Sequence, residues 1–446
     1  MKLCKSALLA NLLLSAAVVA QQPAHMAPAP QSGASAQAAN AQTLTLEQAE
    51  AIALKSNPQI SVGRLRALIA REFVVEQRSA LLPNATINLT AVDSNPGSRV
   101  AAGGLNNPVI FPRAAGGAAL SQLITDFGRT TSLVSSAQYG AKAEEQNEVA
   151  TRAQILLAVD SAFYGALETQ ALVRVAEQTV EARRILADKV SALTKAKLKS
   201  DLDMSFANVD LSRAKLQLLE AKNNAETSLA ELSAILGYPD LQNFVLSETQ
   251  SSAQPLEPDP APLIQEALRD RPEANALRLD VQSAEKFSRA EHDLWRPAVS
   301  ALGVVGEAPV RDDRIPNWYG AVGVNVQIPV FNGLLNNARA KTADLQTEAT
   351  RQRLVDLQNN IARDVRIAWQ DSNRAFQKLS VTQELRDEAN LALELAQSRY
   401  NLGLSSIVEF SQAELQKTEA DISDTSAHYQ FELSRRTLRY VTGNLR

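Results

Sequence analysis

Cysteine, histidine and aromatic residues are scarce in this chain of 446 residues, and each scarcity excludes a kind of chemistry. The one cysteine is Cys4, so a chain processed beyond it has no disulfides and no cysteine catalysis. His25, His292 and His428 have no metal-ligand spacing around them. Only 5% of the residues are aromatic, and the balance of Ala, Leu, Gln, Glu and Arg resembles coiled coil more than a globular core.

Signatures of enzymes and of nucleic-acid-binding proteins are also missing. The net charge of −4 comes without a basic patch, so we expect no nucleic-acid partner. There is no nucleophile elbow and no phosphate loop, and Asp126-Phe127-Gly128 resembles a kinase triplet only by chance. The sequence therefore predicts neither catalysis nor a cofactor, and an enzyme with an unrecognised site has little support.

Long hydrophobic runs are absent beyond the N-terminal region. Residues 1–20 have the pattern of a secretory signal peptide, with Lys2 and Lys5 before the apolar stretch Ala7–Leu14 and small residues up to Ala20. A short membrane anchor is the alternative, but the apolar run is too short to span a bilayer. Cys4 precedes the apolar stretch, whereas a lipoprotein cysteine follows it, so we expect no N-terminal lipid.

The main positive feature of the sequence is an internal duplication. Four landmarks recur at nearly constant spacing: Pro58 as Pro272 and Pro83 as Pro297, each 214 residues later, then Gly128 as Gly333 after 205 and Gly237 as Gly443 after 206. A repeat of this size indicates that one structural unit was duplicated. We assign residues 21–43 to a flexible linker, 44–246 to the first repeat, 247–261 to an inter-repeat linker and 262–446 to the second repeat.

Each repeat is expected to contain two short helices, two strands and a pair of long helices. Prolines end the short helices, because the residue before a proline avoids helical geometry. Alternation of apolar and polar residues predicts strands with one apolar and one polar face, at about 85–92, 118–125, 298–305 and 319–330. Proline-free stretches predict long helices at 129–193, 201–236, 334–399 and 407–441. Their heptad character predicts coiled-coil packing.

The predicted strands require an assembly if they enter a membrane. A chain without a later transmembrane helix can cross a membrane only as a closed β-barrel, since open strand edges are not tolerated there. Four strands cannot close a barrel, whereas two chains supply eight strands and three supply twelve. Helices of about 100 Å must then pack side by side and project from the membrane.

At this level of organisation the sequence resembles the TolC-like outer membrane efflux proteins. The resemblance covers about residues 44–446 and rests on the order of the duplicated elements and on local motifs at Asn57-Pro58, Leu82-Pro83, Gln122–Gly128, Gln327–Gly333 and Arg399–Glu409. It implies an α+β membrane protein and a homotrimer. Its β-barrel would have twelve strands, four per chain, and would continue as a long periplasmic α-helical coiled-coil barrel.

The same resemblance implies a function in export. Such a protein is the exit duct of a tripartite efflux or type I secretion system, a passive conduit for small molecules or proteins across the outer membrane of Gram-negative cells. Its partners are outer membrane lipid, a periplasmic adaptor (membrane fusion) protein and an inner-membrane pump. The alternative that the residues leave open is a periplasmic coiled-coil scaffold whose strand candidates are only loops.

The resemblance also assigns roles to residues of the last helical tip. Glu409 would face the pore axis as part of a periplasmic gate, where three carboxylates repel one another and loosen the closed state. A second gate position falls on Gln412, which is uncharged. Glu409 could instead be an ordinary solvated helix glutamate.

Adaptor docking is expected at both helical tips, through Gly403 and Ser405 in the second repeat and Lys197 and Lys199 in the first. Lys197 stands where the second repeat has Gly403, which could also serve turn chemistry alone. The aromatic residues that flank the strands could form an interfacial belt in the membrane or pack in an ordinary core. They are Phe111, Phe127, Trp318, Tyr319 and Phe331.

Overall fold

A computed structural model describes residues 42–93, 95, 112–248, 255, 258–309, 314 and 316–445. The predicted signal peptide, nearly all of the first linker and Phe111 lie outside the described residues. Among the helices that the structure describes, none combines the length and the apolar character needed to span a bilayer.

Each repeat begins with two short helices separated by an X-Pro step. They are α1 (Leu46–Ser56) and α2 (Pro58–Ser79) in the first repeat, and α5 (Ala261–Asp270) and α6 (Pro272–His292) in the second. Asn57 and Arg271 are extended, with ψ of 123° and 125°, because the following proline disfavours helical geometry before it. Proline then occupies the first turn of the next helix, where no amide donor is needed.

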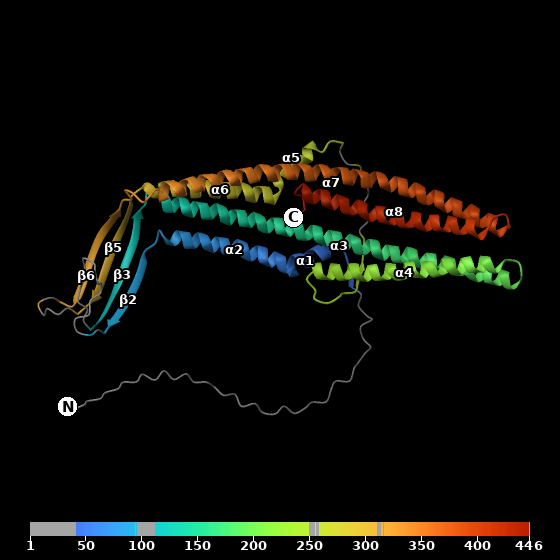
Figure 1. Ribbon diagram of the computed structural model, residues 1–446, viewed down its shortest axis with the longest axis horizontal. Coiled ribbons are helices and arrows are strands. Elements are labelled where there is room, and N and C mark those ends of the chain that lie inside the picture. Colours follow the sequence, from blue (N-terminus) through green and yellow to red (C-terminus); the bar gives the residue numbers. More distant parts are fainter. Residues whose placement is uncertain are drawn as a thin grey trace, which may run out of the picture. The chain divides into compact units, whose positions relative to one another are not determined.

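Two long helix pairs follow, and the pairs are of equal length. α3 (Arg129–Lys195) and α7 (Leu335–Asn401) have 67 residues each, and α4 (Asp201–Ile235) and α8 (Ile407–Val441) have 35 each. Figure 1 shows α4 running beside α3 and α8 beside α7. These bounds differ from those expected from the sequence by at most two residues, since glycines, prolines and capping residues mark the ends.

The four strands form one antiparallel sheet in the order β2-β3-β5-β6. They are β2 (Asn84–Val92), β3 (Arg113–Thr125), β5 (Ala298–Glu307) and β6 (Trp318–Gln327). β3 begins five residues before the expected start at 118, because its Ala-Gly segment pairs with β2 as far as Val92. β6 ends at Gln327, three residues before the expected end at 330, because Pro329 lacks the backbone amide that strand pairing needs.

The structure corrects one part of the linker prediction. Gln42 and Thr43, expected in the flexible linker, belong to β1 (Gln42–Leu44) and pair in parallel with β4 (Phe244–Leu246). Leu44 and Leu246 are both buried in the cluster around Phe163 of α3. A three-residue strand has too little pattern to be recognised, so its partner strand and this burial define it.

Apolar contacts are distributed along the helices in three clusters. The first surrounds Val159 and Phe163 of α3, and its counterpart in the second repeat surrounds Ile361 and Val365 of α7. The third lies near the helical tips and contains Val190. Many buried positions are alanines, and such small side chains let helices approach closely.

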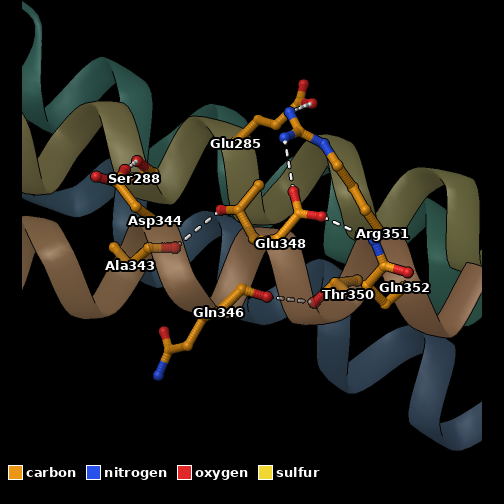
Figure 2. A network of polar contacts seen from close by, with 10 residues as sticks. Glu285, Ser288, Ala343, Asp344, Gln346, Glu348, Thr350, Arg351 and Gln352 are labelled. Atoms are coloured by element: carbon orange, nitrogen blue, oxygen red, sulfur yellow. Dashed lines mark hydrogen bonds and ion pairs between the residues drawn. The ribbon is translucent and has the colours of Figure 1, made fainter.

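Polar contacts also join neighbouring helices at the surface. In Figure 2, Arg351 of α7 lies between Glu285 of α6 and Glu348 of its own helix. Nearby, Ser288 of α6 donates a hydrogen bond of 2.7 Å to Asp344 of α7. Exposed ion pairs of this kind contribute little to stability, so α6 and α7 depend mainly on their apolar contacts.

A η1 turn (Asp293–Trp295) of 3₁₀ helix connects α6 to the sheet. Strand register gives the sheet two chemically different faces, because directly paired residues point to the same side. The mainly apolar face carries Ile87, Leu89, Leu120, Val305, Val322 and Val324, with Gln122 and Glu307 among them. The mainly polar face carries Thr86, Asn88, Thr90, Tyr319, Asn325 and Gln327, with Leu302 and Val304 among them. Every residue of β6 is exposed.

Candidate functional site

The two helical tips have the same backbone geometry. Lys197 and Gly403 both adopt the left-handed conformation, with φ of 59° and 73°. The next amide in each tip, of Leu198 or Leu404, donates back to a carbonyl five residues earlier at 2.8 and 2.9 Å. This is a Schellman turn, which satisfies the last carbonyls of a helix. Lys197 therefore occupies the structural position of Gly403, as the repeat spacing indicated.

Glycine suits position 403 because of its left-handed backbone, and no neighbouring atom of the chain limits the size of a side chain there. A Cβ built on Gly403 meets no heavy atom within 4 Å, so an added methyl would only force a side chain into the left-handed region. That strain is about 1 kcal/mol. Lys197 already carries it, which makes the first tip the less favourable of the two turns.

Glu409 lies in the first turn of α8, three residues after the N-cap residue Ser406. Its amide donates to the hydroxyl of Ser406 at 3.3 Å, and its carboxylate pairs with Nε of Arg399 at 3.1 Å. In the first repeat the equivalent Asp203 instead completes a capping box with Ser200. Both acids suit the positive end of a helix dipole, so capping alone explains an acid here. The exposed pair with Arg399 holds Glu409 on its own chain.

Gln412 follows Glu409 by almost one turn and lines a groove between α4 and α8. The groove is also lined by Phe206 and Arg213 of α4 and by Leu415 of α8. The groove is also lined by Arg183, a buried charged residue that the sequence did not single out.

Four side chains from three helices form the Arg183 cluster: Arg183 of α3, Asp210 of α4, and Ser411 and Glu414 of α8. Nη1 of Arg183 donates to the hydroxyl of Ser411 at 3.1 Å, lies 3.6 Å from Asp210 and pairs closely with Glu414. Ser411 also bonds Asp210. Burial raises the pKa of Glu414 and Asp210 adds to that, although Arg183 opposes it. One cation thus faces two carboxyls in a site where loss of a partner is costly.

Tyr400 joins the two tips. It is buried and stacks on Phe410 with ring centroids 5.5 Å apart, and Nζ of Lys199 lies 4.3 Å from the centre of its ring. Burial, with the nearby charge of Asp203, raises the pKa of Tyr400. Within the described residues its hydroxyl has no hydrogen-bond partner, and neither does that of Ser405. Lys199 therefore takes part in the contact between the repeats and Ser405 is half-buried, while Lys197 and Gly403 lie at the surface.

A second buried charged group lies where α1, α3 and α8 meet. Asp160 of α3 is fully buried, and neither carboxylate oxygen has a hydrogen-bond partner among the described residues. Nη1 of Arg436 lies 3.9 Å from Asp160 and 3.4 Å from Glu50. Burial, helped by Glu50, raises the pKa of Asp160 to about 7 against the opposing charges of Arg436 and Arg439.

The aromatic residues predicted for a belt occupy different places. Trp318 and Tyr319 are consecutive in β6, so they point to opposite faces of the sheet. Register puts Trp318 on the side of Val305 and Val322, and Tyr319 on the side of Asn88. The two cannot contact the same surroundings. Phe127, at the junction of β3 and α3, and Phe331, after β6, are both exposed.

Comparison with solved structures gives the class of this fold. The chain is similar to the CmeC outer membrane channel of Campylobacter jejuni, with a TM-score of 0.77, 16% identity, and coverage of 90% of this chain and 85% of that one. It has the fold of outer membrane channel subunits.

The sequence match is more specific. The family model for outer membrane efflux proteins matches residues 49–238 and 263–444, one segment in each repeat, so the chain belongs to the outer membrane efflux protein family. Outer membrane protein TolC of Vibrio cholerae is 23% identical over 413 residues, or 88% of this chain and 89% of TolC. CzcC of Cupriavidus metallidurans, a cobalt-zinc-cadmium resistance protein, is 23% identical over 290 residues, 65% of this chain and 64% of CzcC.

Family membership decides between the alternatives left by the sequence. The protein is an outer membrane efflux channel, and the reading as a periplasmic scaffold is not supported. The family is one of transport ducts and not of enzymes.

Proposed function

We propose that three copies of this chain form the exit duct of a tripartite efflux or type I secretion system. Twelve strands, four from each copy, would form a barrel in the outer membrane, and the long helices would continue it into the periplasm. Residues 1–20 would direct export and be removed, leaving a chain without lipid. The duct would be passive, with an adaptor protein and an inner-membrane pump supplying the energy.

The sheet supports closure by further copies of the chain. β2 and β6 are its edge strands, and edges with unpaired amides and carbonyls are not tolerated in lipid. Because the sheet has an even number of antiparallel strands, β6 of one copy and β2 of the next would also run antiparallel. The exposed apolar face, where Ile87 and Val322 are 79% and 92% accessible, would meet lipid, and the polar face would line water.

The helices support the same arrangement through their unequal burial. α6 packs against both α3 and α7, whereas its counterpart α2 packs against α3. An exposed apolar stripe on α2 follows helical spacing and consists of Val62, Leu65, Ile69 and Phe73. In a ring of copies, α2 would lie between its own α3 and the α7 of the next copy. That position repeats the environment that α6 has within one chain.

The tips support the proposed gate and docking roles in part. When three copies meet at an axis, Glu409 would either break its ion pair with Arg399 or keep it while facing the pore. Because Gln412 is uncharged, the constriction would then have one ring of acidic residues instead of two. Lys197 and Gly403 are exposed and would contact the adaptor. The Arg183 cluster would hold α8 against the first-repeat tip, so widening of the end would have to separate these charges. Trp318, Phe127 and Phe331 remain proposed for the aromatic belt.

Planar-bilayer conductance of the detergent-purified protein, with its mass measured in parallel, tests the proposal. We expect a particle of three chains that conducts ions, and Glu409→Ala should raise its single-channel conductance. A monomer or dimer that never conducts would overturn the trimeric duct. Unchanged conductance and cation selectivity in Glu409→Ala would remove only the gate role.

A further inference from the structure

One row of residues across the sheet combines a tyrosine with two glycines. Tyr319 of β6 pairs with Gly306 of β5, Gly306 pairs with Gly117 of β3, and Gly117 pairs with Asn88 of β2. All four residues therefore lie on the polar face. In the four described strands, Tyr319 is the one aromatic residue of that face.

The tyrosine side chain lies across the two glycines instead of standing off the sheet. A Cβ built on Gly117 would be 2.6 Å from the Tyr319 hydroxyl oxygen, and one built on Gly306 would be 2.7 Å from it. The hydroxyl has thus crossed β5 and reached β3. Any larger residue at either position would lift the phenol ring away from the sheet, so both glycines are needed for the ring to lie flat.

The flat ring leaves an aromatic surface accessible on a face that carries mostly small, amide and hydroxyl side chains, together with Leu302, Val304 and Arg113. Tyr319 is 44% exposed although one side of it covers the glycine pair. Aromatic cover of a cross-strand glycine stabilises a sheet by itself, and here it leaves the outer side of the ring accessible. An exposed π face attracts cations and stacks with planar rings.

We propose that Tyr319 is a cargo-contact residue, a flat platform on the channel wall that favours aromatic organic cations. The proposal rests on the proposed function, in which the polar face lines the duct. Such cargo would stack on the ring, and the glycines would let the platform add contact without narrowing the passage.

Binding of rhodamine 6G, an aromatic cation, to the detergent-purified full-length chain tests the proposal by fluorescence anisotropy. Tyr319→Leu should weaken binding about two- to fivefold, the value of an exposed cation–π contact, while Tyr319→Phe should retain it. Trp318→Leu is the matched control, because it removes the neighbouring aromatic from the opposite face. Unchanged affinity in Tyr319→Leu, or an equal loss in Trp318→Leu, would overturn the proposal. If Tyr319→Leu failed to assemble, Tyr319→Met would be measured against the same criteria.

A labelling experiment separates this proposal from the function on which it rests. Cys4 is the only natural cysteine, so Asn325→Cys and Val324→Cys in chains lacking Cys4 report the two faces of β6 separately. In proteoliposomes a water-soluble maleimide should label Asn325→Cys and spare Val324→Cys. The reverse pattern would refute the orientation of the duct. The expected pattern together with unchanged dye binding in Tyr319→Leu would refute only the platform.

Discussion

Replacing Asp160 by asparagine should stabilise this protein at alkaline pH, although the change removes a buried charged group. The aspartate is fully buried without a hydrogen-bond partner among the described residues, Arg436 lies 3.9 Å away, and burial and Glu50 raise its pKa to about 7. At neutral pH and above, folding therefore keeps a carboxylate in surroundings that favour the protonated acid. An amide has nearly the same shape and never ionises.

The sign and size of the effect follow from proton linkage. The folded chain binds the Asp160 proton more tightly than the unfolded chain does, so this stabilisation is complete below the ordinary pKa of 3.8 and is lost as pH rises through about 7. Each pH unit within that range is worth about 1.4 kcal/mol. Between pH 5 and pH 8.5 the wild type should lose about 3 kcal/mol that Asp160→Asn does not lose. Glu50 shares the titration, since coupled carboxyls ionise as a pair.

Guanidinium denaturation of the detergent-solubilised protein at pH 5 and pH 8.5 measures this difference. Glu348→Gln is a matched control, because hydrogen bonds from Gln352 and Arg351 lower the pKa of Glu348 (Figure 2). Glu348 is thus largely ionised in both states throughout this range, and its variant should show little such pH dependence. A constant offset between Asp160→Asn and wild type at both pH values would refute the argument.

Four other substitutions, two of them with a control variant, test the tips and the proposed assembly. In the same denaturation assay, Lys197→Gly should stabilise the protein by about 0.5–1 kcal/mol, and Gly403→Ala should destabilise it by about 1 kcal/mol. A much larger loss in Gly403→Ala would mean that a neighbouring group excludes a side chain at this position. Arg183→Met should cost about 3–5 kcal/mol because it leaves the buried Glu414 beside the half-buried Asp210 without a cation. Arg213 is an exposed arginine of the same groove, so Arg213→Met should cost little. Ile69→Glu should prevent trimer formation in light scattering, whereas Arg64→Glu on the same helix should leave it intact; trimers of normal stability in Ile69→Glu would exclude α2 from the interface.

Local signals of the sequence were sufficient for most of the fold. Prolines after Asn57 and Arg271 and glycines after the return helices fix helix ends through backbone sterics, which do not depend on distant residues. The alternation in β2 and β6 was readable for a similar reason. The start of β3 was not, because Ala114–Gly117 has no polar residue to alternate with, and only its partner strand defines it.

Residues of the candidate site could be predicted only where the spacing between the two repeats placed them at equivalent positions. Lys197 could be placed opposite Gly403 by counting, and both have positive φ. The Arg183 cluster could not be found in this way, because its partners Ser411 and Glu414 follow 228 and 231 residues later. An arginine on a long, polar helix has the pattern of a solvated residue until the packing of α8 buries it. Asp160 was missed on the same grounds.

The two repeats have long helices of equal length but differ in the charged residues where they meet. At the repeat spacing of 206 residues, Arg183 corresponds to Ala389, which is buried, and Asp210 corresponds to Gln416. Among the residues that the structure describes, the charge cluster therefore occurs once, and it ties α8 to the first-repeat tip without a counterpart that ties α4 to the second. Because a buried ion pair is costly to break, separation of the tips would have to disrupt this cluster as well as the apolar contacts around Tyr400.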